Sequence, residues 1–206
     1  MELLLAFDPA VLAAFILAGL LLNITPGVDF LLVTSSGING GGAVGRAAGW
    51  GINLGIVVHI LLAAAGVSAL LSAYPLAYDA IRYAGAAYLL WIAYKAWTDS
   101  GELAQGAAAL TRRDAFRRGL ITNLLNPKTA LFIFAFLPQF TDPALGAVGA
   151  QILILGAIFT VNGLLFTLIL GTLAGRLGPA LRGQIRILNK LTAILFGGLA
   201  VRLATQ

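Results

Sequence analysis

Two ionisable residues lie inside long apolar stretches of this chain, and they are its strongest candidates for chemistry. Asp29 lies in the apolar run 11–33, and Lys128 lies in the apolar run 120–140. A charged side chain at the centre of a membrane-spanning helix costs roughly 2.5–3.5 kcal/mol on insertion scales. Such residues usually serve a pathway for ions or solutes, so each is a candidate to bind a proton or a charged ligand group.

Each charge follows a sequence that interrupts a helix. Asp29 follows Thr25-Pro26-Gly27, and Lys128 follows Asn126-Pro127. Proline removes a backbone donor and clashes with the preceding turn, which frees carbonyls and exposes the ends of two half-helices. Interrupted apolar segments at corresponding places in two halves of a chain are typical of the binding site of a secondary transporter. Both prolines could instead be plain structural kinks.

The remaining polar candidates each have a structural alternative. Asn23, Asn123 and Asn126 could bind a small polar ligand, or they could satisfy backbone groups that the interruptions leave unpaired. His59 shares a helix face with Gly51 and Gly55. It could relay protons, since histidine ordinarily titrates near neutrality, or it could bond to a neighbouring helix. The alternatives for Asp29 are a structural ion pair or a helix cap, and Lys128 could simply extend to the membrane surface.

The elements that position these residues must lie in a membrane. Of the 206 residues, 60% are apolar and only 10% are charged, whereas a soluble domain has about 25% charged residues. Cysteine is absent, which excludes disulfides and thiolate metal sites. No motif indicates a metal, an organic cofactor, a nucleotide site or nucleic-acid binding. The composition thus predicts an all-α integral membrane protein in contact with the lipid bilayer.

A spanning helix needs about 20 mostly apolar residues, and six stretches meet that requirement. They cover about 9–35, 44–72, 75–97, 117–140, 145–173 and 184–204, with the first and the fourth interrupted. The glycine-rich stretch 35–45 is predicted to be a flexible turn, and 176–190 is predicted to be the last connection. Pairs of glycines in the second span, Gly45 with Gly49 and Gly51 with Gly55, are typical of closely packed helices.

The basic residues predict the orientation. Of the 13 Lys and Arg residues, ten lie at the first, third and fifth connections, two (Arg82 and Arg202) lie at the opposite side, and Lys128 is internal. Cytoplasmic loops are enriched in Lys and Arg, so both termini are predicted to lie outside the cytoplasm. Residues 1–206 would form one transmembrane domain, in which 98–116 joins two three-helix repeats, 1–97 and 117–206. Three spans is an odd number, so the repeats are inverted.

Four motifs together resemble the LysE/RhtB family of bacterial amino-acid exporters, and the resemblance covers nearly the whole chain. They are Thr-Pro-Gly-Val-Asp at 25–29, Gly-Arg-Ala-Ala-Gly at 45–49 with Gly55 and His59, Gly-Ala-Ala-Tyr-Leu at 85–89, and Asn-Pro-Lys at 126–128 with Leu-Pro-Gln-Phe at 137–140. Val28 departs from the family, which usually has a second proline there. The resemblance implies proton-driven export of amino acids across the bacterial inner membrane, without naming the amino acid.

The sequence therefore predicts a secondary transporter for amino acids or related zwitterions, with protons as the coupled ion. A passive channel and an exporter of cations are the alternatives. A membrane-embedded enzyme is disfavoured because Asp29 has no second carboxylate deep in the membrane, and because no nucleophile elbow surrounds a serine. A homodimer is compatible with the sequence.

Overall fold

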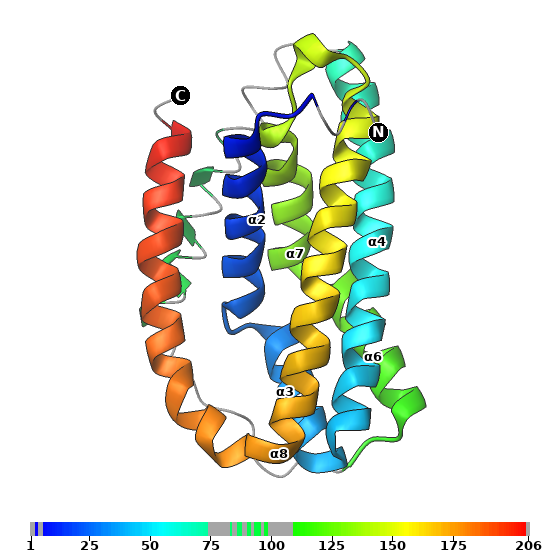
Figure 1. Cartoon of the computed structure of the whole chain (residues 1–206), viewed down its shortest axis with the longest axis vertical. Coiled ribbons are helices and arrows are strands. Elements are labelled where there is room, and N and C mark those ends of the chain that lie inside the picture. The colour runs from blue at the N-terminus through cyan, green and yellow to red at the C-terminus, as the bar shows by residue number, and fades with distance from the viewer. Residues whose placement is uncertain are drawn as a thin grey trace.

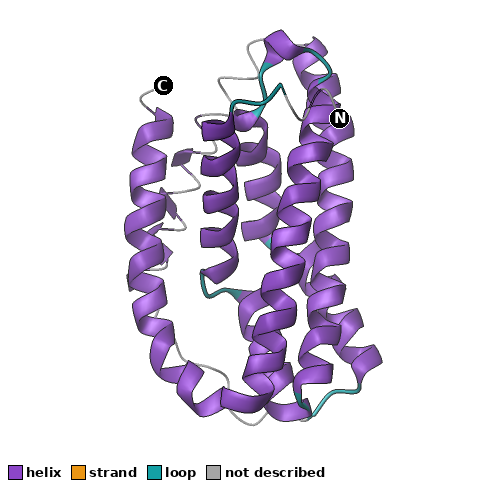
Figure 2. Ribbon diagram, viewed as in Figure 1, coloured by secondary structure: helices purple, strands orange, loops and turns teal. Residues whose placement is uncertain are grey.

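The computed structural model describes residues 3, 6–73, 83, 86–87, 90–91, 93–95, 97–98 and 109–204. All regular secondary structure in these parts of the chain is helical (Figure 2). Most of the predicted third span, 75–97, lies outside the described residues, although those described between 83 and 98 are helical. The predicted helical class is confirmed.

The first broken segment consists of α2 (Pro9–Ile24) and α3 (Val28–Gly40), which are bent by 55° relative to each other. Helix α2 begins where the Asp8 carboxylate accepts a hydrogen bond from the Ala10 amide at 2.7 Å, with proline at the favourable first position. It ends at Thr25, before Pro26, and α3 begins after Gly27. We call residues 25–27 the first break.

The predicted flexible turn at 35–45 is wrong. Helix α3 continues to Gly40, and α4 (Gly42–Ala73) begins after a single residue, Gly41, whose φ of 81° suits glycine. The other glycines permit close packing, since a Cβ on Gly37 or Gly45 would lie within 3.0 Å of Gly171 backbone atoms in α8. These contacts explain why glycine-rich sequence forms helix here.

The second broken segment consists of α6 (Arg112–Leu124) and α7 (Pro127–Leu131), continued by the π-helix η1 (Phe132–Phe136) and the 3₁₀-helix η2 (Leu137–Phe140). Its two parts are bent by 51° at residues 125–126, which we call the second break. Thr111 caps α6, so this helix begins five residues before the predicted boundary of 117. A short 3₁₀-helix, η3 (Pro143–Leu145), precedes the last helix.

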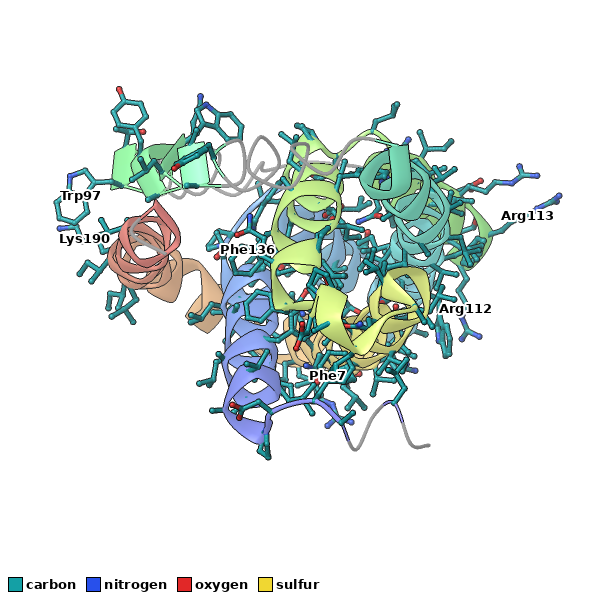
Figure 3. The ribbon with its side chains drawn as sticks, turned by 90° about the horizontal axis from the view of Figure 1, so that it is seen from above. Phe7, Trp97, Arg112, Arg113, Phe136 and Lys190 are labelled. Carbon is teal, nitrogen blue, oxygen red and sulfur yellow. The ribbon has the colours of Figure 1, made fainter. Side chains whose placement is uncertain are left out.

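The last helix, α8 (Val148–Ala204), remains helical through 176–190, where a connection was predicted. The chain nevertheless changes direction there, because α8 runs down one side of the molecule, curves, and returns upward (Figure 1). The predicted fifth and sixth spans are thus the two arms of one bent helix. The returning arm lies beside the described residues 83–98, and Lys190 Nζ stands 5.8 Å from the centre of the Trp97 ring (Figure 3).

The core forms where α4 packs against both α6 and the first arm of α8. Glycines of α4 make both contacts: Gly51 lies directly against the Phe116 carbonyl of α6, and a Cβ on Gly49 would stand 2.9 Å from the Thr167 side chain of α8. The predicted role of these glycines in close helix packing is confirmed. Five phenylalanines extend the core in a chain of ring contacts, namely Phe159, Phe132, Phe136, Phe140 and Phe15.

Two helical stretches in the described residues are long and apolar enough to cross a membrane, Gly42–Gly66 and Val148–Arg176, and each broken segment adds one more if it is a single span. The two broken segments run in opposite directions, and their breaks lie at about the same height (Figure 1). The start of α2 and the end of α8 lie at the same end of the molecule. This arrangement brings the two breaks together in the middle of the protein.

Candidate functional site

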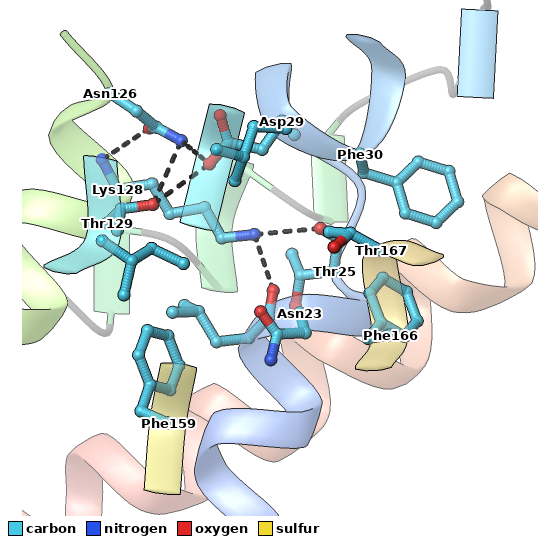
Figure 4. A pocket seen from close by; sticks show the side chains of 14 residues that line it. Asn23, Thr25, Asp29, Phe30, Asn126, Lys128, Thr129, Phe159, Phe166 and Thr167 are labelled. Atoms are coloured by element: carbon cyan, nitrogen blue, oxygen red, sulfur yellow. Dashed lines mark hydrogen bonds between the residues drawn. The ribbon is translucent and has the colours of Figure 1, made fainter. Parts of the chain in front are cut away.

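Each break holds the charged residue of the other broken segment. Lys128, in the first turn of α7, donates from Nζ to the carbonyls of Leu22 at 3.0 Å and Thr25 at 2.9 Å (Figure 4). Leu22 lies in the last turn of α2 and Thr25 is the residue that ends it, where helical carbonyls have no partner within the helix. The negative end of the helix dipole lies at the same place and favours a cation. The first break therefore provides a binding site for the ammonium of Lys128.

Asp29 is held by side chains of the second broken segment. Its Oδ2 accepts hydrogen bonds from Asn123 Nδ2 at 2.7 Å, from Asn126 Nδ2 at 2.9 Å and from the Thr129 hydroxyl at 3.3 Å. Asp29 also lies in the first turn of α3, where the positive end of the helix dipole favours an anion. Its second oxygen, Oδ1, is buried and has no partner among the described residues.

The structure thus keeps the two charges apart from each other. No ion pair joins Asp29 to Lys128, both of which are described. Hydrogen bonds to a charged group contribute about 1.5–3 kcal/mol each, so the bonds to backbone and amide partners offset much of the cost of burial. Asp29 retains a free oxygen atom, and Lys128 has a third N–H beyond the two that reach carbonyls.

Asn126 has two tasks at the second break. Its Oδ1 accepts from the Lys128 amide at 2.9 Å, which caps α7, while its Nδ2 donates to Asp29. Pro127 occupies the first position of α7, where its missing N–H costs nothing. Pro127 therefore begins a new helix here, with Asn126 fixing its start. The sequence left open whether the asparagines bind a ligand or satisfy the backbone, and Asn126 bonds to both backbone and side chain.

His59 lies behind the site and contacts it through Asn123. The His59 ring is buried, and its Nε2 is 3.2 Å from the Asn123 carbonyl oxygen. A carbonyl can only accept, so Nε2 carries the proton in this bond. Phe134 packs edge-on against the ring at 6.0 Å between centres. The structure thus places His59 in the position of the structural alternative, with its bond directed to the end of α6.

A cavity of about 30 Å³ lies between the breaks. Its polar wall contains Asn23, Thr25, Gly27, Asp29, Asn126, Lys128 and Thr129, and its apolar wall contains Leu22, Phe30, Ile52, Ile56, Phe159 and Phe166, with Thr167 beside them (Figure 4). A water molecule needs about 10–15 Å³ on this measure. The cavity in this conformation can hold water but is too small for an organic ligand, whose pockets are typically about 300 Å³ or larger.

The structure brings most of the predicted site residues together. Asn23, Thr25, Gly27, Asp29, Asn126 and Lys128 line the cavity, and Asn123 bonds to Asp29. Pro26 lies in the first break, and Pro127 directly follows the second. A Cβ on Gly27 would stand 3.5 Å from Lys128 Nζ, so the absence of a side chain there keeps the approach to the ammonium open. His59 does not line the cavity and reaches the site only through its bond to Asn123.

Sequence reasoning missed Thr129 and the residues of α8 that face the cavity. Thr129 follows Asn126 by three positions, a spacing that places both side chains on one face of the first turn of a helix. That spacing was an available signal. Phe159, Phe166 and Thr167 carried none, because lining residues on an apolar helix look like ordinary core residues.

Comparisons with known proteins identify the family. The family model described as LysE type translocator matches residues 20–206. The chain is 35% identical over 189 residues to a homoserine/homoserine lactone efflux protein of Salmonella typhimurium, covering 89% of this chain and 90% of that protein. It is 30% identical over 197 residues to a leucine efflux protein of Enterobacter sp. (strain 638), covering 93% of each.

A protein of Vibrio cholerae, described as an uncharacterized membrane protein, is 30% identical over 202 residues, covering 96% of this chain and 98% of that protein. No solved structure shows significant similarity. The matched region includes both breaks and both charged residues of the cavity. The chain therefore belongs to the LysE family of translocators, which makes it a membrane transporter and not an enzyme.

Proposed function

We propose that this transporter exports amino acids, or closely related small zwitterions, in exchange for protons. The observation that carries the proposal is the pair of opposite charges in the cavity. Asp29 and Lys128 are the one acid and the one base in its lining, and they are bonded to separate partners. A free α-amino acid carries the complementary pair of charges. The named efflux proteins among the relatives support the same class of substrate.

The two ends of the substrate have different partners in this proposal. The carboxylate binds the Lys128 ammonium and the N-terminus of α3 at Gly27, where backbone N–H groups have no partner within the helix and no side chain caps them. The ammonium binds Oδ1 of Asp29, the oxygen that Asn123, Asn126 and Thr129 leave unpartnered. Asn23 and Thr25 line the space between these two ends.

Coupling to protons follows from competition at Asp29. A proton on Oδ1 and a substrate ammonium beside it cannot both be bound, so each excludes the other. Antiport requires that exclusion, because the carrier must return with a proton after it releases the substrate. Lys128 does not compete in this arrangement, because its charge is held by the carbonyls of Leu22 and Thr25. His59 supports the geometry of the second break.

Transport requires a conformational change because the cavity of about 30 Å³ is too small for an amino acid. We infer that residues 1–97 and 117–206 act as two inverted three-helix repeats, and that one repeat rocks against the other. The opposite directions of the two broken segments support this proposal. Pro26 and Pro127 lie at the joints around which the half-helices would tilt.

The orientation completes the proposal. The protein resides in the bacterial inner membrane with both termini outside the cytoplasm, supported by the ten basic residues at the first, third and fifth connections. The start of α2 and the end of α8 lie at the same end of the molecule in Figure 1, which agrees with an even number of spans. A reporter that is active only in the cytoplasm, fused after Gln206, should therefore be silent, and activity there would require another orientation.

A passive channel is the main alternative, and an exporter of cations has less support because the Lys128 ammonium lies beside the cavity's one carboxylate. Membrane vesicles distinguish exchange from passive flow. They are filled and bathed with the same concentration of an amino acid, and a pH gradient is then applied. An antiporter builds a concentration difference from the pH gradient, whereas a channel leaves the concentrations equal.

A further inference from the structure

A basic surface lies on the first turns of α6, at the end of the molecule opposite to the start of α2 (Figure 1). Four exposed arginines belong to it: Arg112, Arg113, Arg117 and Arg118. Figure 3 shows Arg112 and Arg113 at the outer edge of the molecule. None of the four lines the cavity between the breaks, so the transport site gives these arginines no role.

The opposite side of α6 packs against α4. Ala115 and Asn123 are fully buried, and Gly119 between them lies directly against the Ala48 carbonyl. These residues of α6 repeat every four positions, a spacing that places them on one face of a helix. Four other residues repeat at the same spacing from two positions earlier, and they form the outward face: Arg113, Arg117, Ile121 and Leu125.

The outward face changes from charged to apolar along its length. Its first two turns carry Arg113 and Arg117, with Arg118 beside them. The residues that follow expose three aliphatic side chains, namely Ile121 (57% exposed), Leu124 (37%) and Leu125 (77%). At 1.5 Å per residue, the whole face is about 18 Å long. A phospholipid has the same order of chemistry, with a charged headgroup followed by hydrocarbon.

The positive charge of this face is not neutralised by the described parts of the protein. Arg113, Arg117 and Arg118 form no hydrogen bond or ion pair with any described residue. The one acid on α6, Asp114, accepts a hydrogen bond from the Thr111 hydroxyl at 2.6 Å. It also lies in the first turn, where the helix dipole favours an anion. The arginines are therefore available to an anion from outside the chain.

We propose that this face of α6 binds a phospholipid with a net negative headgroup. The guanidinium groups of Arg113, Arg117 and Arg118 donate to the phosphate oxygens, for which their paired N–H groups have the matching geometry. The acyl chains lie along the aliphatic part of the face. Basic clusters directly beside a membrane-spanning helix attract anionic lipids. The inference goes beyond the proposed function, and its test involves no transport.

The experiment measures which lipid lies beside α6. The full-length chain has three tryptophans. All three are replaced by phenylalanine, and Ile121→Trp then places a single fluorescent reporter on the exposed face. Vesicles contain phosphatidylcholine and phosphatidylglycerol in a fixed ratio, and either one lipid or the other has brominated acyl chains. Bromine quenches a nearby tryptophan, so quenching per mole of each lipid reports its local concentration.

We expect phosphatidylglycerol to be enriched at least about fivefold over phosphatidylcholine at the reporter on residue 121. This factor corresponds to about 1 kcal/mol, the contribution of a single basic residue at an anionic surface. Replacing Arg113, Arg117 and Arg118 by glutamine should remove the enrichment. Equal quenching by the two lipids, or enrichment that survives this triple variant, would overturn the inference.

A second reporter tests whether the enrichment is local. Leu165→Trp on α8 is matched to Ile121→Trp, because the two native side chains are 56% and 57% exposed. They also lie at similar heights along α4: Leu165 is between Gly163 and Thr167, which contact Asn53 and Gly49, whereas Leu120 beside Ile121 contacts Gly51. We expect less than about twofold enrichment at residue 165. The same enrichment at both reporters would refute a specific lipid site on α6.

Two further controls separate the lipid from charge in general and from a free anion. Replacing the exposed residues Lys95, Arg176 and Lys190 by glutamine removes the same charge elsewhere, and the enrichment at residue 121 should remain. Loss of enrichment in this variant too would overturn the assignment to α6. Excess inorganic phosphate should have no more effect than sodium chloride at the same ionic strength. Specific relief of quenching by phosphate would show that the arginines bind a free anion instead of a lipid.

Discussion

The two breaks use different chemistry to do the same task. The first break, residues 25–27, and the helix ends beside it offer backbone groups. The carbonyls of Leu22 and Thr25 bind Lys128, and the start of α3 has no side-chain cap. The second break offers side chains: Asn126 caps its own half-helix, and with Asn123 and Thr129 it binds Asp29. The bends themselves are similar, at 55° and 51°.

The difference indicates which break receives the substrate. Backbone N–H groups at the start of α3 have no cap, whereas the start of α7 is already satisfied by Asn126. The backbone N–H groups at the first break are therefore available to hydrogen-bond a substrate, whereas the second break holds Asp29 in place. Variants of the second break should act through Asp29, and variants of Lys128 should act on substrate binding itself.

Replacing the cation should do the most damage. Lys128→Ala removes the partner of the substrate carboxylate and the two hydrogen bonds from Nζ to the carbonyls of Leu22 and Thr25. Loss of a buried charged hydrogen bond costs about 1.5–3 kcal/mol, so we expect export and substrate exchange to fall by about 10- to 100-fold. The two rates are measured in parallel vesicle assays. Lys95→Ala provides the control, because Lys95 is exposed and lies 6.0 Å from the Trp91 ring, away from the cavity.

Substitutions of Asn126 and of its neighbour Pro127 should differ in how much they reduce proton-driven export. Asn126→Ala removes both the cap of α7 and a donor to Asp29, and we expect proton-driven export to fall by roughly tenfold or more for about 1–2 kcal/mol of lost bonding. Pro127→Ala keeps both bonds, since alanine is tolerated at the start of a helix, and it should reduce export much less. Equal losses would indicate that proline, and not the asparagine cap, maintains the break.

A substitution at Gly55 can displace the Asn123 side chain from Asp29 while Asn123 itself is unchanged. A Cβ on Gly55 would stand 2.6 Å from Asn123 Oδ1 and 2.9 Å from its Cβ, so Gly55→Ala must push the amide away from Asp29. We expect proton-driven export to fall by about three- to tenfold, in line with one weakened hydrogen bond of about 1 kcal/mol. Gly66→Ala on the same helix has open space around it and should export like wild type. If both variants export equally well, Asn123 does not position Asp29.

His59 should tolerate a substitution that preserves its bond. Glutamine can donate to the Asn123 carbonyl from roughly the place of Nε2, whereas asparagine is too short, and neither residue titrates. We expect His59→Gln to retain most proton-driven export and His59→Asn to lose about two- to tenfold, the range of one hydrogen bond of about 0.5–1.5 kcal/mol. Equal and complete loss in both variants would assign proton transfer to His59.

The sequence predicted the helical class and the two breaks because proline and glycine act locally. The predictions were wrong where the local structure depends on residues that are distant in the chain. Gly37 and Gly45 read as flexible, yet they pack against Gly171, more than 120 residues away in the chain. The stretch 176–190 was predicted to be a connection because it holds four basic residues, but the helix curves through it.

For the site, the residue types were predictable and their partners were not. A lone Asp29 and a lone Lys128 suggest an ion pair, and only the geometry of the breaks provides the carbonyls and amides that keep them apart. Carbonyls have no signature in the sequence, since every residue has one. The asparagines were recognisable as polar residues beside a break, but their direction toward Asp29 depends on the crossing of the two broken segments.

The proposal depends above all on the carboxylate of Asp29 as the group that proton and substrate share. Asp29→Asn keeps the shape and can no longer be protonated. In vesicles, pH-driven uptake of an amino acid and exchange of that amino acid across the membrane are measured side by side. We predict that Asp29→Asn loses the pH-driven uptake while exchange, though weakened, remains measurable. If the variant still builds an amino-acid gradient from a pH gradient, the proton is carried elsewhere and the proposed coupling is wrong.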